Sequence, residues 1–124
     1  MTLEALYQAI DGDYDQALKV LRVEKLLDKH IKKLPQNKVF ASLRAAGESM
    51  DAEQLFESAH AMKGVCANLG LVKISNAASD IAEEFRPGNS RSMTDEQVKA
   101  IVRDIDAMYQ KAVSGIQTYT KEQS

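Results

Sequence analysis

Chain-breaking residues are scarce in this sequence, and their scarcity constrains the fold more than any other feature. Only six glycines and two prolines occur among the 124 residues, and no run alternates apolar with polar residues as a half-buried strand does. Apolar residues recur at helical spacing instead. The one cluster of loop-forming residues lies at 86–92. The sequence therefore predicts an all-α protein, and its short connections favour an antiparallel helical bundle.

The first part of the chain contains two apolar patterns at helical spacing. One predicts a short helix at residues 3–10, which the polar residues 11–13 interrupt. The other extends over residues 13–47 and contains Pro35. Proline removes a backbone donor and disfavours helical geometry in the residue before it, so a break or a kink is expected there. Residues 13–47 could therefore form one bent helix or two segments.

Two further helices are predicted on either side of a glycine. Asp51 is suited to be the N-cap of a helix at residues 51–69, and Gly70 is the usual residue to end one. A second helix follows at residues 71–85. The apolar positions of these two helices step by three and four residues, which is typical of packing seams. They are Leu55, Ala59, Met62, Cys66 and Leu69, then Leu71, Ile74, Ala78, Ile81 and Phe85.

The last helix begins at Thr94, which can form a capping box with Gln97. Its apolar stripe extends almost to the polar residues 120–124, where we expect a flexible tail. A chain of this length can bury a single hydrophobic core without a metal or a disulfide to stabilise it. Residues 1–124 are therefore predicted to form one domain.

The composition excludes several classes of protein. The formal net charge is −2, so no overall field attracts nucleic acid or an anionic membrane. The lone Cys66 excludes an internal disulfide framework and a multi-cysteine zinc site, and it favours a reducing compartment. No apolar stretch approaches the roughly 20 residues that span a bilayer, and the first ten residues lack the pattern of a secretory signal. We expect a free-standing cytoplasmic protein.

One histidine is predicted to face solvent beside a small clearing. On a wheel of about 100° per residue, His60 lies about 140° from the centre of the apolar stripe of its helix. Lys63, Gly64 and Ala67 follow on the same side. A glycine inside a helix costs about 1 kcal/mol relative to alanine, so Gly64 indicates close approach by another helix or by another protein. A neutral imidazole beside an ammonium group could accept a phosphoryl group.

The stretch around this histidine resembles the signature of a known family. Residues 59–70 read Ala-His-Ala-Met-Lys-Gly-Val-Cys-Ala-Asn-Leu-Gly, and they are similar to the signature of histidine phosphotransfer (HPt) domains. In that signature His, Lys, Gly and a later Leu-Gly recur at these spacings. Similarity also covers residues 43–46, 51–56 and 74–86.

This resemblance implies both a fold and an activity. The fold is a monomeric, antiparallel up-and-down four-helix bundle with a short additional N-terminal helix. The activity is that of a phosphorelay intermediate without kinase activity or a cofactor of its own, because the Mg²⁺ belongs to the partner. The partners are receiver domains of a hybrid sensor kinase, of a response regulator, or of both. His60 is then the phosphoacceptor, Lys63 stabilises the phosphoryl oxygens, and Gly64 lets the receiver approach.

The resemblance also implies docking residues and identifies two departures. Arg86 matches a basic residue that family members often keep near the end of the next helix. We expect the partner to contact Phe56, Glu57, Ala61 and Ala67 as well. Phe56 lies at the boundary of the apolar stripe and could equally belong to the core. Many relatives have a glutamine that bonds to the histidine, where this chain has Ala82, and a serine after the glycine, where it has Val65. Water or Glu57 could orient the imidazole instead, or no group at all. The family often has a proline in its first bundle helix, which favours one kinked helix at residues 13–47.

Two alternatives differ in class from a phosphorelay. Glu57 and His60 have the Glu-x-x-His spacing of di-metal helical bundles, but a second copy of the motif is missing. The other alternative is a helical adaptor that binds a partner through the same face and is never phosphorylated. The second histidine, His30, lies between lysines, where a solvated surface role is expected.

Overall fold

The computed structural model describes residues 1–123 and contains helices and connections only, with no strand in that range. The helices, in chain order, are α1 (Leu3–Ala9), α2 (Tyr14–Leu21), α3 (Glu24–Ile31), the 3₁₀ turn η1 (Leu34–Gln36), α4 (Val39–Ser49), α5 (Ala52–Asn68), α6 (Val72–Glu84) and α7 (Asp95–Glu122). None of the helices described is both long and apolar enough to cross a membrane.

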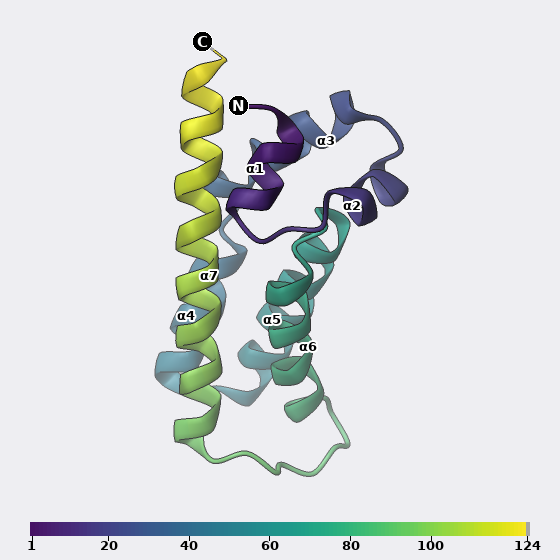
Figure 1. Ribbon diagram of the computed structural model, residues 1–124. Helices are drawn as coiled ribbons and strands as arrows, with labels where there is room; N and C mark the ends of the chain where they lie inside the picture. Colours follow the sequence, from purple (N-terminus) through teal and green to yellow (C-terminus); the bar gives the residue numbers. More distant parts are fainter. Residues whose placement is uncertain (124) are drawn as a thin grey trace.

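The four C-terminal helices form a bundle in chain order. α5 packs between α4 and α6, and α7 closes the ring by packing against α4 and α6. Consecutive helices run in opposite directions, and α7 extends along the whole molecule (Figure 1). The short helices α1 to α3 lie at the end of the bundle opposite the α6–α7 loop (Figure 1). The predicted all-α four-helix bundle is therefore confirmed.

The preferred prediction of one kinked helix over residues 13–47 is wrong. α2 ends at Leu21, Arg22 adopts a positive φ of 76°, and the chain is extended at the next residue. The reason is the phase of the apolar residues. Leu18 and Leu27 are nine residues apart, which is about two and a half turns, so an unbroken helix would place them on opposite sides. The break lets both pack against the core. A second break occurs at η1, which contains Pro35, as expected for proline.

The predicted packing seams are buried. Leu55, Ala59, Met62 and Cys66 of α5 are fully buried, and the seam residues of α6 contribute to the same core. The predicted caps are present, because the Asp51 carboxylate accepts a hydrogen bond from the Gln54 amide (3.0 Å). Thr94 and Gln97 form the full capping box. Residues 120–122 of the expected tail are helical, and Ser124 lies outside the described residues.

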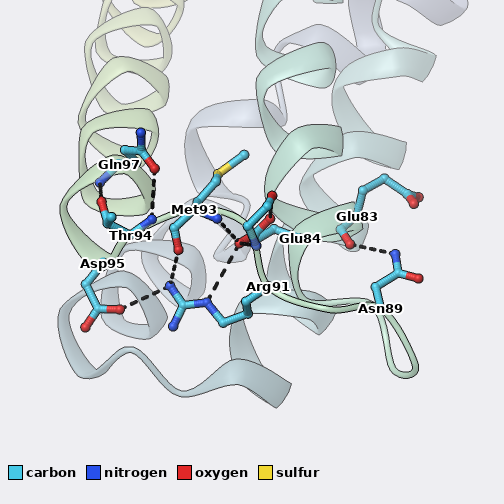
Figure 2. Close-up of polar contacts among 9 residues, drawn as sticks. Glu83, Glu84, Asn89, Arg91, Met93, Thr94, Asp95 and Gln97 are labelled. Atoms are coloured by element: carbon cyan, nitrogen blue, oxygen red, sulfur yellow. Dashed lines mark hydrogen bonds and ion pairs between the residues drawn. The ribbon is translucent and has the colours of Figure 1, made fainter.

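A buried carboxylate organises the connection from α6 to α7. Glu84 is only 7% exposed, and its carboxylate accepts hydrogen bonds from the amides of Ser92 (2.8 Å) and Met93 (2.6 Å) and from the Ser92 hydroxyl (3.0 Å). The Arg91 guanidinium lies 3.8 Å away (Figure 2). These bonds, first of all that from Met93, hold the pKa of Glu84 below its usual value. The Asn89 amide also donates to the Glu83 carbonyl (2.9 Å), so the C-terminal end of α6 is fixed.

Candidate functional site

His60 lies on the exposed face of α5, as the helical wheel predicts. The buried seam of this helix includes Leu55, Met62 and Cys66, which contact the core and fix the rotation of α5. His60 is well outside that seam. The side chain is therefore available to a second protein without any change in the fold.

Gly64 lies one turn after His60 and faces open space. A Cβ atom built at this position meets no heavy atom within 4 Å, apart from its chain neighbours and its own helix backbone. The contrast with Gly115 is clear, because a Cβ there would lie 2.5 Å from Ile10. Close packing of helices therefore does not account for Gly64, and neither does its backbone, which is helical. Of the two reasons predicted for Gly64, close approach by another helix is therefore excluded, and close approach by another protein is left.

Lys63 lies on the side of α5 that faces α6. Its side chain is half-buried, and its backbone carbonyl accepts a hydrogen bond from the Ser75 hydroxyl of α6 (3.1 Å). The pKa of Glu83 lies below its usual value, mainly because Arg86 donates hydrogen bonds to its carboxylate and, to a smaller extent, because Lys63 is positively charged. Arg86 therefore pairs with Glu83 at the edge of the site, and the charge of Lys63 acts on the same carboxylate.

The ring of Phe56 connects His60 to Arg86. The rings of Phe56 and His60 are stacked, with centroids 5.7 Å apart and an interplanar angle of 21°. The Arg86 guanidinium carbon lies 5.7 Å from the centre of the same Phe56 ring. Two nitrogens of Arg86 donate to Glu83 at 3.1 Å and 2.5 Å. The structure thus brings Phe56 and Arg86 together with His60, a contact that the sequence pattern does not reveal.

No hydrogen bond orients the imidazole in the part of the chain that the structure describes. The position that many relatives fill with glutamine is Ala82, which is 1% exposed and has no polar side-chain atom. Val65 is half-buried, and Glu57 is exposed and does not bond to His60 within residues 1–123. Ala82, Val65 and Glu57 therefore supply no hydrogen bond to this histidine in the described chain.

The other predicted contact residues surround His60 on the surface of α5. Ala61 and Ala67 are exposed, like Glu57 and Arg86, whereas Phe56 is half-buried. Glu57 and Ala61 line a hollow between α5 and α4. Val65 lines a second hollow, which the sequence did not indicate and which α3 and η1 complete on the other side. His30 is exposed at the edge of that second hollow.

The structure gives no support to a di-metal site at Glu57 and His60. Within residues 1–123, no group of three or more His, Cys, Asp or Glu side chains is arranged to hold a metal ion. Bundles of the di-metal class take ligands from several helices that project inward. Both residues here lie on the outer face of α5 instead.

Comparison with known proteins identifies the family. The sequence model of the Hpt domain matches residues 1–114. Searches of curated proteins and of solved structures each found no match. Hpt domains are phosphocarriers in two-component signalling, and their partners are receiver domains, response regulators or kinases. Since the match covers most of an all-helical chain with this signature at its exposed histidine, the chain belongs to the Hpt family of histidine phosphotransfer domains and takes part in two-component phosphoryl transfer.

Proposed function

We propose that this chain is a phosphorelay intermediate that accepts a phosphoryl group from a receiver-domain aspartate onto His60 and passes it to a second receiver. The observation that carries the proposal is the exposed imidazole beside the unobstructed Gly64 on α5. An acyl phosphate at the bottom of a receiver's active site reaches a nucleophile only if the two surfaces come close. The open space at Gly64 allows this approach.

The chemistry requires one nucleophile on this chain. A ring nitrogen of neutral His60 attacks phosphorus with its lone pair, while the other ring nitrogen keeps its proton. The new bond joins nitrogen to phosphorus, and the bond between phosphorus and the aspartyl oxygen breaks, so the receiver regains a carboxylate. Attack by the aspartate of a second receiver on the phosphohistidine reverses these changes. The Mg²⁺ of both steps belongs to the receiver.

Two cations of this chain are suited to stabilise the transferred group. Lys63 follows His60 by three residues, so its ammonium group can reach phosphoryl oxygens on the imidazole. Arg86 contributes from the residues just after the end of α6, where it lies over Phe56. Glu83 forms an ion pair with Arg86 and is also influenced by the charge of Lys63, so one carboxylate offsets part of the positive charge before a phosphoryl group is present.

Small residues around His60 are suited to a transient interface. The side chains at three positions project little from the helix, namely Ala61, Gly64 and Ala67. Phe56 provides an apolar contact at the edge of this surface. Interfaces of this kind have a modest hydrophobic centre with a polar rim, to which Glu57 contributes here. We expect the protein to act as a cytoplasmic monomer.

Other nucleophiles are less suited to this chemistry. Cys66 is fully buried, and burial raises the pKa of its thiol to about 12, so it is not a thiolate at neutral pH. His30 is exposed but is flanked by Lys29 and Lys32 on a separate helix, without a glycine beside it. Of the two histidines, His60 is the one followed by a glycine that faces open space.

The test is transfer from purified receiver domains that have been phosphorylated with acetyl phosphate. We expect wild-type protein and the matched control His30→Gln to remove phosphate from at least one receiver, and His60→Gln to remove none. Equal transfer by His60→Gln would place the acceptor elsewhere. Binding of receivers without any transfer would instead support the adaptor.

A further inference from the structure

The geometry around His60 leaves one requirement of phosphoryl transfer unexplained. In-line attack needs a ring nitrogen that points in a defined direction, since small errors in orientation reduce the rate strongly. No hydrogen bond fixes the imidazole within the described chain, and Ala82, at the position where many relatives have a glutamine, is buried and has no polar side-chain atom. An exposed histidine side chain with no partner samples several rotamers. Some other contact must limit these rotamers.

Phe56 makes the contact that can do so. It lies one helical turn before His60, where side chains four residues apart meet, and the two rings stack with an interplanar angle of 21°. Phe56 is itself half-buried against the core, so its ring is less mobile than a fully exposed one. An imidazole that leaves this stack loses the contact between the rings, which favours the stacked rotamer.

The far end of α6 holds Phe56 in turn. The Arg86 guanidinium carbon lies 5.7 Å from the centre of the Phe56 ring, and the guanidinium donates three hydrogen bonds to the Glu83 carboxylate. The backbone at this point does not move freely, because Asn89 bonds to the Glu83 carbonyl and Glu84 binds the following loop (Figure 2). Two successive contacts, from Arg86 to Phe56 and from Phe56 to His60, therefore link the C-terminal end of α6 to the imidazole.

We propose that Phe56 is the positioning residue for His60, and that ring stacking takes the place of a hydrogen bond to the imidazole in this protein. The inference rests on the proposed function, because it assigns to Phe56 a role in the reaction of His60. Phe56 does not touch the phosphoryl group. It restricts the direction in which the nucleophilic nitrogen points before the receiver arrives.

The first test uses the unphosphorylated protein alone. Three-bond couplings of the His60 side chain, measured by NMR, report its χ1 rotamers. We expect one dominant rotamer in wild type and in Phe56→Tyr, which keeps the ring, and averaged couplings in Phe56→Leu. Phe85→Leu is the matched control, because Phe85 is a buried aromatic residue that contacts Arg91 rather than Arg86. A single rotamer in Phe56→Leu would overturn the proposal.

The second test separates positioning from docking. With a receiver that phosphorylates wild type, we expect the single-turnover transfer rate at saturating receiver to fall about tenfold in Phe56→Leu and to recover in Phe56→Tyr. A change confined to the receiver concentration at half-saturation would make Phe56 a docking residue only and would overturn the proposal. Phe56→Met replaces Phe56→Leu if that variant does not fold.

The two proposals fail in different ways. If no receiver transfers phosphate to wild type, the relay is wrong, yet the couplings still show whether Phe56 fixes the ring. If transfer occurs at His60 and the couplings do not respond to Phe56→Leu, the relay stands and the positioning role is wrong.

Discussion

The Tyr7 hydroxyl donates a hydrogen bond to the Leu69 carbonyl at 2.7 Å, across 62 residues of sequence. Tyr7 is fully buried, which raises the pKa of its hydroxyl. The bond satisfies a carbonyl at the C-terminal end of α5, where the helix no longer provides a partner. Helix α1 therefore helps to fix the turn that follows the helix of the phosphoacceptor.

Replacing Tyr7 by phenylalanine should reduce the free energy of unfolding by about 1–2 kcal/mol, because the Leu69 carbonyl stays buried without its donor. Urea unfolding measures this change. The matched control is Tyr14→Phe, since the Tyr14 hydroxyl bonds to Glu24 near the surface and its loss should cost little. Equal losses of unfolding free energy in the two variants would show that the hydrogen bond to Leu69 does not stabilise the protein.

Two glycines of the same region should respond to alanine in opposite ways. Gly64→Ala should stabilise the protein by about 0.5–1 kcal/mol, since it adds a helix-favouring methyl group to open space. Gly70→Ala should destabilise it by about 2 kcal/mol or more, because Gly70 has a φ of +69° and its Cβ would lie 2.3 Å from the Asp13 carbonyl oxygen. Thermal unfolding of both variants measures this contrast.

The larger variant Gly64→Leu tests the functional side of this position. It should fold as stably as Gly64→Ala but should lose at least about tenfold in phosphotransfer from a receiver, because the side chain fills the approach to His60. A transfer rate equal to that of wild type would show that the receiver does not come close to Gly64. It would contradict the proposal that this glycine lets the receiver approach His60.

Removing the charge of Lys63 should slow transfer without unfolding the protein. Lys63→Gln should reduce the transfer rate about tenfold, because one donor to the developing charge is lost, and Lys63→Arg should retain most of it. Lys73→Gln is the control, since Lys73 is an exposed lysine near Asp11, away from the site. If Lys63→Gln and Lys73→Gln behave alike, Lys63 has no role in transfer.

The stability contributed by Glu84 should depend on pH. Its pKa in the folded protein lies below the usual value of 4.5, so its bonds stabilise the protein above that value and are lost as the pH falls through the folded pKa. Glu84→Gln should lower the melting temperature at pH 7, and its difference from wild type should shrink towards pH 3. Glu96→Gln, at an exposed glutamate, should change little at either pH. A difference that stays constant with pH would contradict this account.

The position of His60 could be predicted from the sequence because it depends on few variables. One apolar seam sets the rotation of α5, and a residue 140° from its centre must be exposed, whatever the rest of the fold does. The same holds for Gly64. Caps such as Asp51 and Thr94 are equally local and were found as expected.

Features that depend on tertiary packing could not be predicted in this way. The break at Arg22 contains neither glycine nor proline. The one sign of it in the sequence is the nine-residue spacing of Leu18 and Leu27, which would place them on opposite sides of an unbroken helix. The stack of Phe56 on His60 depends on rotamers, which helical spacing permits but does not decide. A glutamate is ordinarily exposed, and Glu84 is buried because the following loop folds over its carboxylate, which no local pattern in the sequence indicates.

The site of phosphorylation tests the central claim most directly. After reaction with a phosphorylated receiver, the intact protein is digested at alkaline pH and the labelled residue is located by mass spectrometry, with ³¹P NMR to identify the bond. The account predicts one acid-labile, alkali-stable phosphoramidate on His60. A phosphoryl group found on His30 or on any hydroxyl or carboxyl side chain, with His60 unmodified, would contradict it.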